Sequence, residues 1–144
     1  MKKFVFLFIA SMLVSSAIFA DKVIPFDQTP AAVQQFVNKH FGTLKVTYVE
    51  KDNHKYEIRL EDGTEIDFTK KGEWKEVDCK QMAVPQSILD LIPGQIQVYV
   101  DEKYPDRKIS KINIERRKYE IELMGEPDID LDFDKNGNFI KVDY

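Results

Sequence analysis

The motif with the most direct chemical meaning is a run of oxygen-bearing side chains near the end of the sequence. Asp132, Asp134 and Asn136 alternate before Gly137, and Asp143 lies six residues beyond that glycine. Oxygen ligands at positions 1, 3 and 5, glycine at 6 and an acid at 12 are what a calcium loop uses to surround one cation. The flanking residues alternate as strands do, and an Asn-Gly hairpin turn accounts for the same spacing. Calcium binding is therefore kept as the alternative to a structural turn.

A second group of candidates consists of charged residues that alternate with apolar ones. In an extended strand this alternation places the charges on one face and the apolar side chains on the other. Paired carboxylates on one surface can perform acid–base chemistry when their environments separate their pKa values. Nothing in the sequence indicates burial, so we interpret the charges as a solvated face that can attract a partner. The candidate binding residues on this outward sheet face are Lys55, Glu57, Arg59, Lys118, Glu120, Glu122, Asp130 and Asp132.

The remaining reactive side chains do not form a catalytic or metal-binding motif. His40 and His54 are the two histidines and Cys79 is the single cysteine, and their spacing matches neither a zinc site nor a Cys–His nucleophile. The sequence also lacks a Gly-x-Ser-x-Gly elbow, a phosphate-binding loop and a dinucleotide fingerprint. We predict no catalytic residues, no cofactor and no enzymatic activity.

The sequence segments that would form the strands carrying these candidates occur twice in the chain. Residues 56–60, Tyr-Glu-Ile-Arg-Leu, recur 63 positions later as Tyr-Glu-Ile-Glu-Leu. After a two-residue insertion the offset becomes 65, and Gly72-x-Trp74 recurs as Gly137-x-Phe139. Two registers separated by one small insertion predict an internal duplication. The expected copies span about residues 25–80 and 84–144.

Each copy is predicted to begin with a helix. In the first copy Thr29 is the expected N-cap and Pro30 the first helical residue, and Gly42 ends the helix. In the second copy Pro93 opens the helix, and Pro105 ends it because the residue before a proline avoids helical geometry. Apolar residues at helical spacing give both helices one stripe that can cover a sheet.

A meander of about four short antiparallel strands is predicted after each helix. Residues 54–61 alternate in polarity, Asp62-Gly63 signals a tight hairpin, and residues 64–69 return along the first strand. The predicted fold class is α+β, a tandem repeat of helix followed by antiparallel meander with the helices on one face of the sheet. One copy of about 60 residues would be marginally stable. We therefore expect the copies to join, either side by side or core against core.

The first twenty residues are predicted to be a secretory signal peptide. Lys2 and Lys3 precede an apolar run at residues 4–14, and small residues follow, with cleavage expected after Ala20 or, as an alternative, after Ala17. The apolar run is too short to span a bilayer comfortably. We expect residues 21–144 to form a single periplasmic or secreted domain, with no membrane insertion after cleavage.

The composition excludes several classes of partner and fold. Of 144 residues, 43% are hydrophobic and 12% aromatic, which favours a folded domain over a disordered chain. Acidic residues outnumber basic ones by 25 to 21, and no basic block stands out, so nucleic-acid binding is not expected. The single cysteine excludes an intrachain disulfide scaffold.

The ordered motifs of the two copies resemble those of a known family. The Tyr-Glu-Ile-x-Leu strand, followed by Asp-Phe, Gly-x-Trp/Phe and Val-Asp, occurs in both copies of an exported small protein. This pattern resembles the PepSY-like, β-lactamase-inhibitor-like proteins exported by Gram-negative bacteria, over nearly all of residues 29–144. The resemblance implies an α+β tandem with a binding or inhibitory role in the envelope and no catalytic residues.

The sequence thus favours a binding protein over a ligand carrier. We predict an exported, non-enzymatic module that binds or inhibits another protein of the cell envelope, with its target and oligomeric state left open. The alternative is a small-ligand or calcium-binding envelope protein with a pocket between the two copies. Exposed aromatic residues would support that alternative, but alternation assigns Trp74 and Phe139 to the core.

Overall fold

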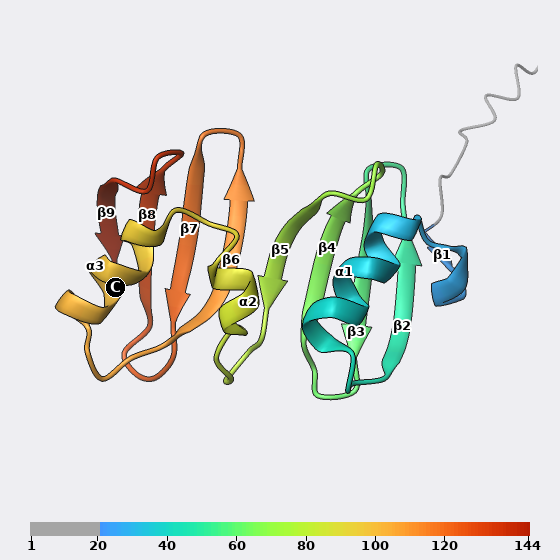
Figure 1. Cartoon of the computed structure of the whole chain (residues 1–144), viewed down its shortest axis with the longest axis horizontal. Helices are drawn as coiled ribbons and strands as arrows, with labels where there is room; N and C mark the ends of the chain where they lie inside the picture. Colours follow the sequence, from blue (N-terminus) through green and yellow to red (C-terminus); the bar gives the residue numbers. More distant parts are fainter. Residues whose placement is uncertain (1–20) are drawn as a thin grey trace, which may run out of the picture.

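Within residues 21–144, the part of the chain that the computed structural model describes, nine strands pair in sequence order into one antiparallel sheet (Figure 1). The predicted signal peptide, residues 1–20, lies outside the described residues. The strands are β1 (Lys22–Val23), β2 (Val46–Lys51), β3 (Lys55–Leu60), β4 (Glu65–Thr69), β5 (Trp74–Asp78), β6 (Ile109–Glu115), β7 (Lys118–Leu123), β8 (Ile129–Asp134) and β9 (Phe139–Asp143). The helices are the 3-10 helix η1 (Phe26–Gln28), α1 (Ala31–Phe41), α2 (Gln86–Leu89) and α3 (Gly94–Lys103).

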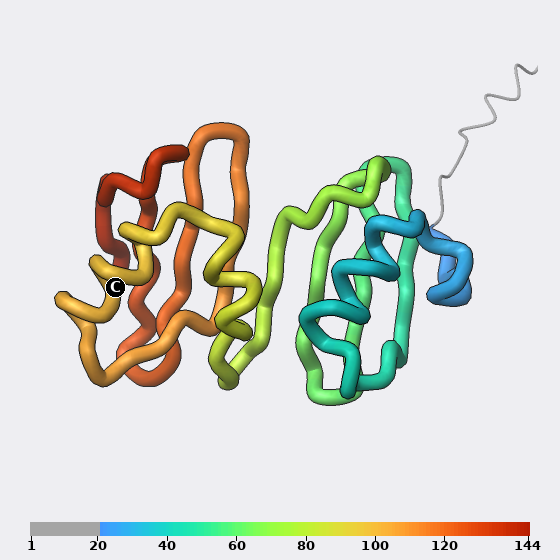
Figure 2. The backbone as a smooth tube through the Cα atoms, in the orientation of Figure 1, coloured from blue at the N-terminus to red at the C-terminus, as the bar shows by residue number. Residues whose placement is uncertain are grey.

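The chain passes from α1 into β2–β5, which we call the first meander, and then through α2 and α3 into β6–β9, the second meander (Figure 2). The two meanders join edge to edge, because β5 pairs with β6 and places Val77 opposite Ile112. The prediction of an α+β protein with an antiparallel meander sheet is confirmed. Of the two ways of joining that the sequence left open, the structure has the side-by-side arrangement.

Both main helices begin directly after a proline. Pro30 precedes α1 and Pro93 precedes α3, and the carbonyls of these prolines accept hydrogen bonds from the backbone of the first turn. The expectation that Thr29 caps α1 was wrong. Its hydroxyl donates to the carbonyl oxygen of Phe26 at 2.7 Å, so it closes η1 instead. No helix in residues 21–144 is long and apolar enough to cross a bilayer.

The pairing register gives the sheet one continuous apolar face. Directly opposite residues on successive strands form an apolar row that crosses the sheet from β2 to β9. All of its members except the half-buried edge residue Val142 are buried, which makes this row the centre of the core. The row consists of Val49, Ile58, Ile66, Val77, Ile112, Ile121, Leu131 and Val142.

Aromatic contacts attach the two helices to this apolar face. Phe36 of α1 stacks on Trp74 with ring centroids 5.7 Å apart and meets Phe68 edge-on at 5.4 Å. Tyr99 of α3 stacks on Phe139 at 4.7 Å. Phe139 is nevertheless 40% exposed, which corrects its assignment to the core. It lies on the edge strand β9, where a neighbouring strand covers it on one side only.

Candidate functional site

The face of the sheet opposite the helices carries two further rows of directly paired residues, which we call the polar face. The same register that aligns the apolar row aligns these side chains, because alternate residues of a strand point to opposite faces. The first row is Glu50, Glu57, Asp67, Glu76, Asn113, Glu120, Asp132 and Lys141. The second row is Tyr48, Arg59, Glu65, Asp78, Lys111, Glu122, Asp130 and Asp143.

On the first meander, ion pairs link the charges of the polar face into a network. The Nζ atom of Lys55 lies 2.6 Å from Asp67 and 3.7 Å from Glu57. Arg59 bridges two strands, with its guanidinium 2.8 Å from Glu57 and 3.6 Å from Glu65. Burial nevertheless raises the pKa of Asp67. Each of these three carboxylates therefore has a cation within 4 Å.

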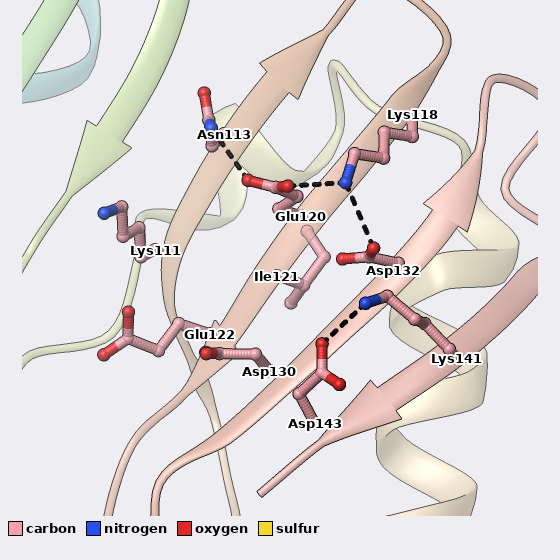
Figure 3. A pocket seen from close by; sticks show the side chains of 10 residues that line it. All are labelled: Lys111, Asn113, Lys118, Glu120, Ile121, Glu122, Asp130, Asp132, Lys141 and Asp143. Atoms are coloured by element: carbon pink, nitrogen blue, oxygen red, sulfur yellow. Dashed lines mark hydrogen bonds and ion pairs between the residues drawn. The ribbon is translucent and has the colours of Figure 1, made fainter.

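On the second meander a similar network surrounds Lys118 (Figure 3). Its Nζ atom lies 2.7 Å from Glu120 and 3.2 Å from Asp132, and Asn113 donates a 2.9 Å hydrogen bond to Glu120. These contacts raise the pKa of Lys118, and the hydrogen bond from Lys118 lowers the pKa of Glu120. Lys141 pairs with Asp143 at 2.9 Å on the edge strand.

Two carboxylates of the second meander lie opposite each other, and Lys111, the cross-strand neighbour of Glu122 on the other side, forms an ion pair with neither of them. Glu122 of β7 and Asp130 of β8 are direct cross-strand neighbours, and within residues 21–144 neither forms an ion pair. Burial, and then the charge of Asp130, raises the pKa of Glu122. Burial, and then the charges of Asp128 and Asp143, raises the pKa of Asp130. The charge of Lys111 offsets this effect only in part, so a further cationic group would relieve the repulsion between the two carboxylates.

The Glu122–Asp130 pair and the Lys118 network line one shallow hollow of about 220 Å³ (Figure 3). Strands β6 to β9 all contribute to it, and polar side chains form most of its walls. Its lining residues are Lys111, Asn113, Lys118, Glu120, Ile121, Glu122, Asp130, Asp132, Lys141 and Asp143.

The structure places all eight candidate face residues on the polar face but in two separate groups. Three lie on β3 in the first meander and five on β7 and β8 in the second, with strands β4, β5 and β6 between them. Alternation alone did not identify Lys111 and Asn113, which flank Ile112 on β6 and complete the hollow. The alternation of that strand was the available signal, but its position beside β7 came only from the pairing.

The four residues of the proposed calcium loop have separate roles. Asp132 is paired with Lys118, and Asp143 with Lys141. The carboxylate of Asp134 accepts hydrogen bonds from the backbone of Asn136 and Asn138, both at 2.9 Å, and so closes the β8–β9 turn. These backbone contacts lower the pKa of Asp134. Within residues 21–144, no three His, Cys, Asp or Glu side chains are grouped so that they could hold a metal ion.

Cys79 has the properties of a core residue rather than of a nucleophile. It is 2% exposed, and burial raises the pKa of its thiol to about 11. At neutral pH the thiol is therefore protonated, whereas nucleophilic attack requires the thiolate. His40 lies elsewhere, with its Nδ1 atom 2.7 Å from the hydroxyl of Ser87.

A helix-covered antiparallel sheet with a charged opposite face defines an α+β protein. The family described as "Putative beta-lactamase-inhibitor-like, PepSY-like" matches residues 19–65 and 56–141. The chain belongs to this family, as its motifs predicted. The comparison with curated proteins gives no match.

Three crystal structures of similar proteins come from the genus Bacteroides. A "putative calcium-regulated periplasmic protein" from Bacteroides thetaiotaomicron is 38% identical with a TM-score of 0.77, and the match covers 86% of this chain and 97% of that one. Two proteins from Bacteroides vulgatus, each described as a "putative periplasmic protein", are 36% and 34% identical, with TM-scores of 0.77 and 0.78. Their matches cover 87% and 86% of this chain and 100% and 97% of theirs. The predicted periplasmic or secreted location is confirmed by these relatives.

Proposed function

We propose that this protein is an exported, non-enzymatic binding module that docks another protein of the cell envelope through its polar face. The observation that carries the proposal is the two-row array of charged side chains on the face away from the helices. Most of these charges are held by ion pairs in defined positions, so the surface is ordered before a partner arrives. Electrostatic complementarity of this kind accelerates encounter and selects among partners.

The polar face also indicates the chemistry of the surface that would dock on it. The Glu122–Asp130 pair favours a lysine or arginine of the partner, because a cation placed there would relieve the repulsion between the two carboxylates. The side chains of Lys55 and Arg59, 43% and 48% exposed, can meet acidic groups of the same partner. Inhibition of that partner would follow if the docked face covered its active site.

We also propose that the two halves of the chain are copies of one unit, and matched contacts in the two halves support this duplication. Lys55 pairs with Glu57 and Asp67 as Lys118 pairs with Glu120 and Asp132. The stacking of Phe36 on Trp74 corresponds to that of Tyr99 on Phe139, and each helix contacts the glycine turn of its own meander. A protein built this way offers two related docking surfaces on one sheet.

Affinity capture from a cell-envelope extract tests the docking proposal. The intact protein is expected to retain a specific envelope protein, whereas Arg59→Glu and Glu120→Lys should each lose it. Matched controls are Lys39→Glu on α1 and Glu102→Lys on α3, which make the same charge changes at exposed positions of the helices. Retention of the captured protein by both polar-face variants would assign docking to another surface.

A small-ligand or calcium-binding role is the second candidate. It is favoured by the hollow on the second meander and by the description of the Bacteroides thetaiotaomicron relative as calcium-regulated. Titration calorimetry with calcium, magnesium and envelope-derived small molecules tests it. Binding of calcium that raises the melting temperature by several degrees and disappears in Asp132→Asn, a substitution in the hollow, would establish this role, and no heat with any ligand would reject it.

A further inference from the structure

The edge strand β9 exposes both backbone and apolar side chains. In the part of the chain that the structure describes, β9 has a neighbouring strand, β8, on one side only. Ile140 is 53% exposed, and Tyr144, directly after the strand, is 83% exposed. The opposite edge differs, because β1 contains only two residues. A five-residue edge with unpaired N–H and C=O groups is a template for another strand, and such edges are usually shortened or covered.

The charged side chains of β9 can form ion pairs when the β9 strands of two copies of the chain pair with each other. Lys141 and Asp143 lie opposite Asp132 and Asp130, so both point to the polar face. In a two-fold symmetric, antiparallel pair of β9 strands, the residue at the symmetry axis lies opposite its own copy. An axis at Lys141 would oppose two lysines, and an axis at Asp143 would oppose two acids. An axis at Val142 places each Lys141 opposite the Asp143 of the other copy.

We propose that two copies of this chain associate through β9, antiparallel and centred on Val142, so that the sheet continues from one copy into the other. The interface would contain two inter-copy Lys141–Asp143 ion pairs and the ladder hydrogen bonds of the strands. The exposed side chains of Ile140, at the bulge of β9, and of Tyr144 lie next to this interface. Because the pairing keeps Lys141 and Asp143 on one side, the polar faces of both copies would form one continuous surface.

Charge exchange on β9 tests this register. Sedimentation over a wide concentration range should show a monomer–dimer equilibrium for the intact protein. Lys141→Asp or Asp143→Lys alone opposes like charges twice per dimer, and should raise the dimer dissociation constant by about tenfold. The double variant Lys141→Asp/Asp143→Lys restores opposite charges in the same register, and its dissociation constant should return to near the original value.

Controls separate loss of pairing from loss of folding. Lys22→Asp changes a lysine at the other sheet edge and should leave the dissociation constant unchanged. Circular dichroism at low concentration should show that every variant is folded. A protein that stays monomeric at all concentrations, or a dimer that the single variants do not weaken or that the double variant does not restore, would overturn the proposal. The docking proposal is judged separately, by the capture experiment with Arg59 and Glu120.

Discussion

The polar faces of the two meanders share one ion-pair pattern and differ in charge at several aligned positions, among them Arg59 and Glu122. Lys55 and Lys118 each join two carboxylates, one on their own strand and one on the next. Four residues further along each strand, Arg59 bridges to Glu65, whereas the aligned Glu122 lies opposite Asp130. A cross-strand ion pair in the first meander thus corresponds to a like-charge pair in the second.

This difference shows how one scaffold can carry two different surfaces. Strand pairing and burial of the apolar row are the same on both sides of the β5–β6 junction, so the fold does not depend on the charge at Arg59 or Glu122. Exposed ion pairs contribute little to stability. The charge of the polar face can therefore vary without loss of the fold.

The largest expected effect tests whether the two halves share one core. Phe68 and Phe133, aligned residues of the two meanders, are both fully buried, and their replacement by alanine should each cost about 3–5 kcal/mol of unfolding free energy. Trp74 lies in the first meander and reports on it by fluorescence during urea unfolding. Because the sheet is continuous, Phe133→Ala should shift the Trp74 transition as strongly as Phe68→Ala. An unshifted transition in Phe133→Ala would mean that the halves unfold independently.

In each meander a turn that contains a glycine lies against the helix of the same half. Gly72 and Gly137 have φ values of +88° and +85°, and a Cβ at Gly137 would lie 2.7 Å from the Cβ of Pro93. At Gly72 the nearest atom, the Cβ of Ala32, would be 3.0 Å away. Gly63 has a φ of +90° but open space around it, so Gly63→Ala isolates the backbone strain, about 1–2 kcal/mol.

Alanine at the two helix-contacting turns should add a packing cost to that strain. We expect an extra cost of about 1–3 kcal/mol for Gly137→Ala and a smaller one for Gly72→Ala. Urea unfolding of the three variants measures the difference. If all three variants lose the same free energy of unfolding, the helices move aside without a packing cost. The contacts between helix and turn would then not differ in strength between the two halves.

Glu122 and Glu120, two residues apart on β7, should affect the pH dependence of stability in opposite directions. The pKa of Glu122 is raised in the folded protein, so the folded state binds this proton more tightly than the unfolded chain does. The contribution of Glu122 to stability therefore decreases as the pH rises from below its unfolded-state pKa to above its folded-state pKa. Glu122→Gln should therefore stabilise the protein at neutral pH, by less than about 1 kcal/mol because the site is largely solvated. The gain should vanish below about pH 4, where Glu122 is protonated in both states.

Glu120 is the matched control with the opposite sign. Its pKa is lowered by Lys118, so its ionised form is the stabilising one, and that contribution is lost as the pH falls through the folded-state pKa. Glu120→Gln should reduce stability at neutral pH and have no effect in acid. Chemical denaturation at a series of pH values measures both variants. The same sign for the two substitutions would contradict the distinction between a paired and an unpaired carboxylate.

The smallest effect on stability is expected at the ends of the two meanders. Cys79 is 2% exposed with a thiol pKa of about 11, whereas the aligned Tyr144 is 83% exposed. A thiol reagent at neutral pH should leave Cys79 unmodified until the protein unfolds, but should modify Tyr144→Cys at once. Tyr144→Cys should leave the free energy of unfolding nearly unchanged. Rapid labelling of native Cys79 would show that this end of the first meander opens.

Local signals in the sequence predicted most of the secondary structure. Alternation located β3, β4 and β7, and proline or glycine marked the starts of α1 and α3 and the turn at Gly63. These signals depend on a residue and its near neighbours. The two-residue strand β1 was missed because so short a segment carries no periodicity, and its pairing with β2 is what makes it a strand.

The candidate site was predicted in its parts but not in its assembly. The eight charged residues were placed correctly on the face opposite the helices, but Lys111, Asn113 and Lys141 were not recognised as parts of the same hollow. Their association depends on β6 and β9 lying on either side of β7 and β8. The partial exposure of Phe139 likewise depends on β9 being an edge.

The sequence by itself determined the alternation of each strand, the turns, the helix stripes and the family, because each is encoded within a short stretch of chain. Only the tertiary structure decided that β5 pairs with β6 and that the meanders form one sheet. It also decided that Glu122 lies opposite Asp130 and that β9 remains at the edge. The physical reason is that strand pairing joins residues far apart in sequence, and the same alternating pattern is compatible with several neighbours.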